Sequence, residues 1–383
     1  MKNRNHRSKN WHKSLAYIFL FCFILLIFIY FRVNNMNQML INDSDRYYDE
    51  EETQNVHVLK TKNPHINAVR LMLFLKDIYG KKILSGQHVD RDSFEIDAIY
   101  GITGKFPAIM GLDFMDYSPS RVERGASGID TDKGIDWWES GGIVDFCWHW
   151  NAPMDLIDKE PDQLWWSGMY TRATTFNLEK GMQDNSSEEY RLLLRDMDAI
   201  AIEFKKLQDA GVPVLWRPLH EASGGWFWWG AKGPKPYKAL WRLMFERFTE
   251  YHQLKNIIWV WDGQDSDWYP GDDVVDIIGE HAYLDPHDYS PLEAKYRKAQ
   301  SYSDENKMLA LTENGPMPDP QNLIDKNISW LWFCTWSETP VVNKERNQYS
   351  DEYTEIHMLK KVYHHEYVIT KDELPDLKNY PIN

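Results

Sequence analysis

Two glutamates, Glu221 and Glu313, stand at the ends of apolar runs that are typical of buried strands. Glu221 closes the run Pro213–Glu221, and Glu313 is the penultimate residue of Lys307–Asn314. A protonated and an ionised carboxyl group that flank a glycosidic bond can cleave it, one as proton donor and the other as nucleophile or base. These residue types therefore predict hydrolysis of a sugar substrate, provided that the fold brings the two together.

The stretch from Trp216 to Gly230, WRPLHEASGGWFWWG, surrounds Glu221 with other groups that could contact a sugar. Arg217 supplies a guanidinium group and His220 an imidazole. Two glycines then permit a tight backbone path before four consecutive aromatic residues, the first of which is Trp226. The combination is typical of a sugar-binding surface. The alternative interpretation is an aromatic core with a solvated acid in the loop.

Short apolar runs alternate with helical patterns along the chain. Ser187–Ala210 is the clearest helix, since Ser187 can cap it; Pro236–Leu254 and Leu292–Glu305 are further candidates. This alternation predicts an α/β fold, a (β/α)8 TIM barrel that forms a single catalytic domain over residues 64–383. A doubly wound open sheet is the alternative, but no glycine-rich phosphate-binding fingerprint follows any run. The eight runs are Lys82–His88, Pro107–Asp113, Gly142–Trp150, Pro213–Glu221, Asn256–Asp262, Val274–Tyr283, Lys307–Asn314 and Ser329–Ser337.

The carboxyl ends of these runs carry polar and reactive side chains, and an active site in such a barrel lies at that end. Glu221 would end strand four and Glu313 strand seven. Barrel dimensions place their carboxyl groups about 5 Å apart, closer to the spacing of retaining glycosidases than to that of inverting ones. The polar residues at the predicted strand ends are Gln87, His88, Asp113, His149, His220, Glu221, Asp262, Tyr283, Glu313, Asn314 and Trp336.

Three other acids compete for a role in the chemistry. Glu280 lies three residues before the end of strand six, where we expect it to be the partner of an arginine such as Arg217. Asp113 and Asp262 have shorter side chains and could equally orient a neighbouring histidine or arginine. A lone histidine at the barrel mouth can likewise be an ordinary hydrogen-bonded residue.

Three motifs resemble those of glycoside hydrolase family 26, a family of β-mannanases. WRPLHE at 216–221 with GWFWWG at 225–230 resembles the family's acid/base signature. LTENG at 311–315 resembles its nucleophile segment, and WHWNAP at 148–153 its third-strand motif. The resemblance covers roughly residues 65–370.

The resemblance implies a retaining, endo-acting β-1,4-mannanase on a (β/α)8 barrel. Its substrate would be a β-mannan polysaccharide or oligosaccharide, and no cofactor or metal is required by its scheme. An enzyme acting on β-glucan or xylan and a non-catalytic carbohydrate-binding barrel stay as alternatives, although both catalytic positions are glutamates. The implied roles are Glu221 as acid/base, Glu313 as nucleophile, His220 as a neighbour that tunes the site, Trp226 as a stacking residue, Tyr283 as a hydrogen-bond donor to the nucleophile, and His149 and Trp336 as glycone contacts. From its residue type, Arg217 could hold Glu313 ionised.

The N-terminal residues predict a membrane segment. Residues 1–14 are basic, residues 15–31 form an uncharged apolar stretch just long enough to span a bilayer, and residues 32–63 have the composition of an acidic, flexible linker. The basic flank places the N-terminus in the cytoplasm and the barrel outside it. A cleaved signal peptide is the alternative, giving a secreted or periplasmic enzyme, but no small-residue cleavage site follows the apolar stretch.

Charge and cysteine content exclude some functions. A formal net charge of -15 argues against a nucleic-acid partner, which requires basic patches. The cysteines are Cys22, Cys147 and Cys334, and the last two fall on strands three and eight, which are not neighbours, so no disulfide is expected. No CxxC or histidine-rich spacing suggests a metal site. We expect a monomeric catalytic domain.

Overall fold

A computed structural model describes residues 59–337, 340–343, 345 and 348–382 of the chain. The predicted basic segment 1–14, the predicted apolar span 15–31 and most of the predicted linker 32–63 lie outside these described residues. Within the described part, no helix combines the length and the apolar character needed to cross a membrane.

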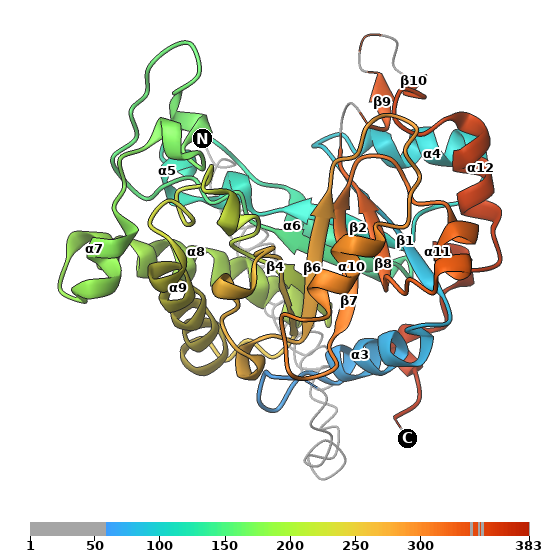
Figure 1. Cartoon of the computed structure of the whole chain (residues 1–383). Helices are drawn as coiled ribbons and strands as arrows, with labels where there is room; N and C mark the ends of the chain where they lie inside the picture. Colours follow the sequence, from blue (N-terminus) through green and yellow to red (C-terminus); the bar gives the residue numbers. More distant parts are fainter. Residues whose placement is uncertain (1–58, 338–339, 344, 346–347, 383) are drawn as a thin grey trace, which may run out of the picture. The chain divides into compact units, whose positions relative to one another are not determined.

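Eight parallel strands in the described part of the chain follow one another in sequence order and close into a barrel, because β1 pairs with both β2 and β8 (Figure 1). This closure confirms the predicted (β/α)8 barrel and excludes the open, doubly wound sheet. A short strand, β11 (Val368–Ile369), pairs in parallel with the first two residues of β1. The barrel strands are β1 (Ile83–His88), β2 (Ile109–Asp113), β3 (Ile143–Cys147), β4 (Val214–Arg217), β5 (Ile257–Trp261), β6 (Ile277–Ala282), β7 (Met308–Asn314) and β8 (Trp332–Thr335).

Helices connect successive strands. The longest, α8, has the predicted cap: the Ser187 hydroxyl accepts a hydrogen bond from the backbone N–H of Tyr190. The predicted helix before β5 continues past α9 as a π-helical turn, Arg247–Tyr251. The helix after β6 is shorter than predicted, because the residues beyond Ala299 include serines and acids that favour turns. The helices are α3 (Ile66–Ile78), α4 (Phe94–Thr103), α5 (Pro119–Val122), α6 (Asp130–Glu139), α7 (Leu178–Gln183), α8 (Glu188–Asp209), α9 (Pro234–Glu246), α10 (Glu293–Ala299), α11 (Pro320–Lys326) and α12 (Ile356–His364).

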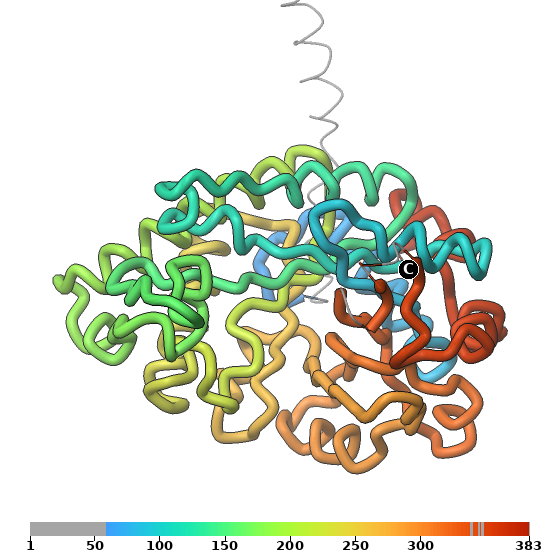
Figure 2. Tube along the Cα trace, turned by 90° about the horizontal axis from the view of Figure 1, so that it is seen from above, coloured from blue at the N-terminus to red at the C-terminus, as the bar shows by residue number. Residues whose placement is uncertain are grey.

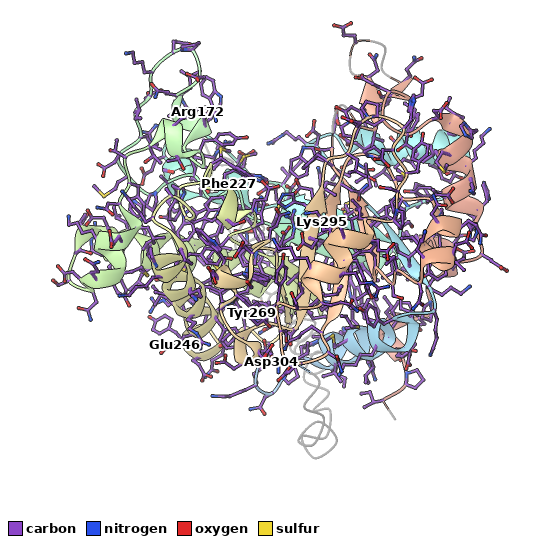
Figure 3. The ribbon with its side chains drawn as sticks, viewed as in Figure 1. Arg172, Phe227, Glu246, Tyr269, Lys295 and Asp304 are labelled. Carbon is purple, nitrogen blue, oxygen red and sulfur yellow. The ribbon has the colours of Figure 1, made fainter. Side chains whose placement is uncertain are left out.

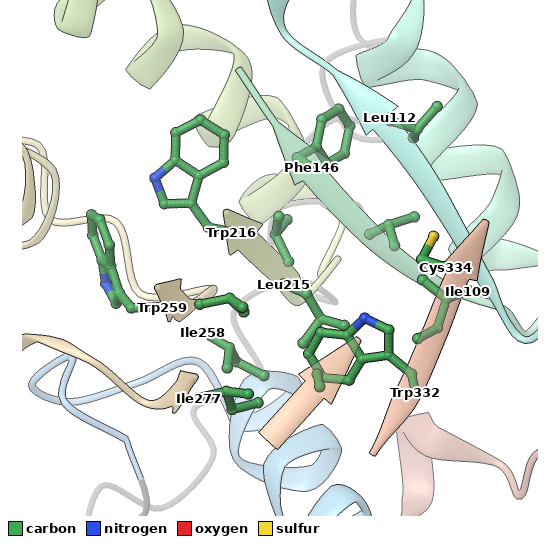
Figure 4. Close-up of a cluster of buried hydrophobic side chains, with 14 of the residues drawn as sticks. Ile109, Leu112, Phe146, Leu215, Trp216, Ile258, Trp259, Ile277, Trp332 and Cys334 are labelled. Carbon is green, nitrogen blue, oxygen red and sulfur yellow. The ribbon is translucent and has the colours of Figure 1, made fainter. Parts of the chain in front are cut away.

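Alternation along the strands divides the apolar residues between two cores. Leu215 and Ile258 point into the barrel interior, where Trp332 also lies (Figure 4). Their neighbours Trp216 and Trp259 point outward and pack against aromatic residues of the surrounding helices. The residues of both cores are buried, so the strands are held rigidly and their carboxyl ends have fixed positions.

The segments above the carboxyl ends of the strands differ greatly in length. Residues 148–187, between β3 and α8, extend to one side of the barrel and contain only short helical turns and α7 (Figure 2). Arg172 of this segment and Phe227 of the β4 loop lie at the upper end of the molecule, whereas Glu246 and Asp304 lie at the opposite end (Figure 3). The long loops thus gather at the end of the barrel where the predicted active site should be.

Residues before Pro64, the predicted start of the catalytic domain, already contact the barrel. Leu59 and Thr61 are buried, and the backbone N–H of Lys60 donates a hydrogen bond of 2.8 Å to the carboxylate of Asp276. The polar composition of this segment is similar to that of a linker. Its backbone and hydroxyl hydrogen bonds nevertheless attach it to the barrel.

Candidate active site

A cavity of about 850 Å³ opens at the carboxyl ends of β1, β2, β3 and β8. His88, Asp113, His149 and Trp336 are among the residues that line it. All four were predicted from strand ends, and the barrel brings them together. Glu221 and Glu313 are not among the lining residues; Glu221 follows β4 and Glu313 is on β7, and these are the next strands around the barrel.

Glu221 lies in the loop after β4, in the left-handed backbone region with φ 56°. Its backbone N–H donates to the carbonyl of Asp262, which fixes the loop against β5. One carboxylate oxygen accepts a 2.8 Å hydrogen bond from Trp226 Nε1, and the other is 3.2 Å from Nε2 of His281. Burial and the charge of Glu313 raise the pKa of the Glu221 carboxyl, against the effects of His281 and Trp226. The group is therefore suited to donate a proton.

Glu313 is on β7 and has an environment of the opposite character. Arg217 Nη2 lies 2.8 Å from one carboxylate oxygen, and the Tyr283 hydroxyl donates to the other. Burial alone would raise the pKa of Glu313, but the Arg217 guanidinium, together with His281 and the Tyr283 hydroxyl, outweighs burial and lowers this pKa. Glu313 is therefore held ionised, as a nucleophile must be.

A continuous chain of charged groups joins the two glutamates. Arg217 contacts Asp262 at 3.3 Å as well as Glu313, and Asp262 is 3.4 Å from Nδ1 of His281, whose other nitrogen faces Glu221. Burial opposes the charge of Asp262, yet His281 and Arg217 lower its pKa to about 2. Asp262 thus orients a histidine and an arginine, as predicted for this acid.

His281 is a residue of the site that was not predicted from the sequence. A signal was present, because His281 precedes Tyr283 by two residues on strand six, and alternate residues of a strand point to the same side. Since Tyr283 was expected to face the nucleophile, His281 could have been placed in the site as well.

Asp113, His149 and His220 form a second hydrogen-bonded network in the site. His149 Nδ1 is 2.5 Å from Asp113 Oδ2, and its Nε2 is 3.2 Å from Nε2 of His220. Burial would lower the pKa of His149, but the Asp113 carboxylate raises it; burial and the Arg217 charge keep the pKa of His220 well below its usual range. The Asp113 carboxylate thus favours the protonated form of His149, whereas burial favours the neutral form of His220 beside Glu221.

The four consecutive aromatic residues have two different environments. Trp226 is 44% exposed beside Glu221, and a Cβ on Gly224 would lie 1.9 Å from its ring, so this close approach requires glycine. Phe227, Trp228 and Trp229 are buried. Three of the four thus belong to the core, and one is available to a ligand.

Trp336 completes the residues predicted to contact the glycone. Its ring centroid is 5.2 Å from that of His88 and 5.7 Å from that of His149. His88 itself is hydrogen-bonded to the carbonyl of Thr312, and burial lowers its pKa to about 4, so it is a neutral residue of the barrel mouth.

The prediction that Glu280 pairs with an arginine such as Arg217 was wrong. Glu280 pairs with Lys295 of α10 at 3.0 Å, whereas the partners of Arg217 are Glu313 and Asp262. Glu280 points away from the barrel interior toward the helix layer, so it is no competitor for the chemistry.

One set of residues in the described part of the chain could hold a metal ion. A carboxylate oxygen of Asp113, the sulfur of Cys147 and a ring nitrogen of His149 all lie within 4.8 Å of one another. Sequence spacing gave no sign of this set, because it combines residues of two adjacent strands. As placed by the sequence analysis, Cys147 is on β3 and Cys334 on β8, and both are buried, free thiols.

Comparison with known proteins identifies relatives of this chain. Residues 60–373 match the family model described as glycosyl hydrolase family 26. A mannan endo-1,4-beta-mannosidase of Thermothelomyces thermophilus is 46% identical over 314 residues, covering 82% of this chain and 62% of the relative. Mannan endo-1,4-beta-mannosidase A of a Piromyces species is 36% identical, covering 80% of this chain and 49% of the relative. The chain thus spans about half to three-fifths of the length of these curated relatives.

Solved structures show the same fold. The GH26-CBM35 beta-(1,4)-mannanase of Podospora anserina aligns with a TM-score of 0.79 and 43% identity, covering 84% of this chain and 69% of that one. A beta-mannanase from a symbiotic protist of the termite Reticulitermes speratus, solved with a gluco-manno-oligosaccharide, aligns with a TM-score of 0.73 and 32% identity, covering 83% of this chain and 97% of that one.

Proposed function

The chain belongs to glycosyl hydrolase family 26, and we propose that it is an endo-acting β-1,4-mannanase that hydrolyses mannan, galactomannan or glucomannan with retention of configuration. The observation that carries this proposal is that the surroundings of Glu221 and Glu313 shift the pKa values of these two glutamates in opposite directions. Glu221 has a raised pKa and Glu313 a lowered one, and a pair of carboxyl groups with pKa values moved apart can divide the roles of acid and nucleophile. The names of the relatives support mannan as the substrate.

In the first step, the Glu313 carboxylate attacks the anomeric carbon while Glu221 gives its proton to the departing glycosidic oxygen. The bond to the leaving sugar breaks, and a glycosyl ester on Glu313 forms. Arg217 and Tyr283 hold Glu313 in its ionised form until attack. In the second step, Glu221, now a carboxylate, takes a proton from water, whose oxygen displaces Glu313 and restores the β-anomer.

The other residues of the site act on binding and orientation. Trp226 offers a half-exposed indole face next to the proton donor, where it can stack on a sugar ring. His149 and Trp336 line the cavity and contact the glycone, and His220 holds His149 through its ring nitrogen. The scheme uses only side chains of this chain.

The substrate is tested by incubating the purified full-length chain with mannan, galactomannan, glucomannan, xylan and mixed-linkage glucan. We expect mixtures of oligosaccharides from the first three, with the β-anomer formed first in the proton NMR spectrum. Cleavage confined to xylan or β-glucan would replace the substrate assignment, initial formation of the α-anomer would contradict retention, and binding without cleavage of any polymer would make the barrel a carbohydrate-binding protein.

The two glutamates are distinguished by removing each in turn. Glu221→Ala should still be glycosylated by an aryl mannoside with a good leaving group, and the intermediate should accumulate because its hydrolysis lacks a base. Azide, which needs no deprotonation, should restore turnover and give the β-glycosyl azide. Glu313→Ala should form no intermediate, and azide should give only the α-product. The same anomer from both variants would overturn the assignment.

We further propose that the catalytic barrel acts as a monomer outside the cytoplasm, attached to the membrane through residues 15–31. A polymeric substrate, which does not cross a membrane, supports this location, as do the basic residues before that stretch. Membrane fractionation, with proteolysis of intact cells and size-exclusion chromatography of the purified protein, tests it. Release of the enzyme into the soluble fraction would favour cleavage of the segment instead.

A further inference from the structure

Three side chains with metal-binding atoms meet beside the catalytic residues, at the ends of β2 and β3. Asp113 and Cys147 are directly opposite each other in the register of these two strands, and His149 follows Cys147 by two residues. His149 Nδ1 is 2.5 Å from Asp113 Oδ2 and 4.0 Å from Cys147 Sγ. Their arrangement depends on adjacent rigid strands rather than on mobile loops.

The hydrogen bonds around this group already resemble those of a prepared metal site. Asp113 Oδ1 accepts hydrogen bonds from the backbone N–H groups of Met115 and His149, at 2.8 and 3.0 Å, which leaves Oδ2 directed at the imidazole. His149 Nε2 is bonded to His220. Ligating histidines in metal sites have such a partner on their second nitrogen, because it fixes the orientation of the ring.

The group is accessible from the active-site cavity. Asp113, Cys147 and His149 all line the cavity of about 850 Å³. An ion that enters there meets three ligand atoms, and the side facing the cavity is left for water. Three protein ligands and one open position are a common arrangement around zinc.

We propose that Asp113, Cys147 and His149 bind a thiophilic divalent cation, Zn²⁺ or Cd²⁺, which occupies the cavity in competition with the sugar. The combination of sulfur, imidazole nitrogen and carboxylate oxygen favours such ions over Mg²⁺ or Ca²⁺, which prefer oxygen ligands alone. Binding forms one bond from each side chain to the ion, and the protons of the Cys147 thiol and of His149 Nδ1 are released to solvent.

The adjustment required is small. Around a tetrahedral zinc ion, nitrogen and oxygen ligands are roughly 3.3 Å apart, and sulfur and nitrogen roughly 3.6 Å. His149 Nδ1 must therefore move away from Asp113 Oδ2 and toward Cys147 Sγ, from the present 2.5 and 4.0 Å. Both of these changes are below about 1 Å, and the ligand atoms of Asp113 and Cys147, which lie within 4.8 Å of each other, need to approach by no more than about 1.2 Å.

The effect on catalysis rests on the proposed function, whereas ion binding does not. Since His149 is a proposed glycone contact, an ion on it should raise KM for mannan and leave kcat unchanged at saturating substrate. Mg²⁺ and Ca²⁺ at the same concentration should have no effect.

The test uses the full-length chain and replaces each of its three cysteines singly, as Cys22→Ser, Cys147→Ser and Cys334→Ser. Cys334 is the matched control, because it is also a buried thiol on a barrel strand. Binding is followed by titration with Cd²⁺, using the ultraviolet sulfur-to-cadmium charge-transfer band. Inhibition by Zn²⁺ is measured against the metal-free activity of each variant.

We expect the charge-transfer band and the Zn²⁺ inhibition in the wild-type, Cys22→Ser and Cys334→Ser proteins. In Cys147→Ser the band should be absent and the affinity lower by at least about tenfold, since losing even an outer partner of a metal ligand costs about 10–100-fold. A band that persists in Cys147→Ser, or one that is lost with Cys334→Ser, would overturn the proposal.

The failure of the metal site can be distinguished from the failure of the proposed function. A band that depends on Cys147, in a protein that cleaves no mannan, would refute the function and retain the site. If Cys147→Ser does not fold, X-ray absorption by the zinc-loaded wild-type protein decides: one sulfur neighbour with nitrogen and oxygen neighbours supports the site, and a shell without sulfur contradicts it.

Discussion

Replacing His281 by glutamine should move the alkaline limb of the pH–activity profile to higher pH. His281 lies between two carboxylates, with Nε2 3.2 Å from Glu221 and Nδ1 3.4 Å from Asp262. Burial would lower the pKa of His281, but these carboxylates raise it, which favours the positively charged form of the ring. That charge stabilises the carboxylate form of Glu221 and opposes the protonation that catalysis requires.

The size of the effect can be bounded from the distance. Two unit charges 3.2 Å apart attract by about 5 kcal/mol at an effective dielectric constant near 20. Opposite charges at this range usually move a carboxyl pKa by about 1–3. We expect the limb to rise by about 1–2 pH units, because neighbouring groups will relax around the uncharged side chain.

The direction follows from the role of each group. Glu221 must hold its proton, so activity is lost as pH rises through its pKa, and a higher pKa moves that loss to higher pH. Asp262 gives a change of the same sign, because without His281 its negative charge acts more strongly on Glu221. The acid limb, set by Glu313, should rise by less, since Arg217 contributes more than His281 to holding Glu313 ionised.

The assay is kcat/KM for a manno-oligosaccharide over the pH range in which both proteins stay folded, because this ratio reports groups of the free enzyme. His252→Gln is the matched control, since His252 also pairs with an aspartate, Asp198 at 2.7 Å, but outside the site. An alkaline limb of His281→Gln that stays in place or falls would refute a charged His281 acting on Glu221, as would an equal change in the control.

Further predictions concern other parts of the site and the N-terminus. Trp226→Ala should reduce kcat/KM far more than it lowers Tm, whereas Trp229→Ala, in the buried core, should cost about 3–5 kcal/mol in the free energy of unfolding; the reverse order would exclude stacking by Trp226. Tyr283→Phe should move the acid limb to higher pH, because the hydroxyl lowers the pKa of Glu313, and an unchanged limb would contradict that role. N-terminal sequencing of the mature protein should include residues 15–31, and a sequence that begins near residue 35 would show cleavage.

The barrel could be predicted because its signals are local. Each strand is a short apolar run, and polar residues lie at its carboxyl end or shortly after it, so both the order of the strands and the position of the site follow from the sequence. The ends of the strands were less accurate. Gly142–Trp150 was predicted as one run, yet β3 ends at Cys147, because the apolar pattern continues in Trp148 and Trp150, which stack on each other outside the hydrogen-bonded ladder.

Contacts between strands could not be predicted in the same way, because they depend on register and on local irregularities. The pairing of β6 with β7 shifts between Glu280 and His281, so Glu280 lies opposite Leu311 whereas His281 lies opposite Glu313. Asp113 and Cys147 likewise face each other only because β2 and β3 align them. Neither relationship leaves a spacing in the sequence.

The difference between the two glutamates arises from these same contacts. Both are buried, and burial raises the pKa of each, so the residue type and its depth in the barrel do not separate their roles. Arg217 separates their roles, because its guanidinium contacts Glu313 and Asp262 directly. The positive charge nearest to Glu221 is instead that of His281, which also pairs with Asp262. The charge of Glu313 then raises the pKa of Glu221 further, so ionisation of the nucleophile itself helps to keep the acid protonated. A single buried arginine on β4 thus assigns both roles.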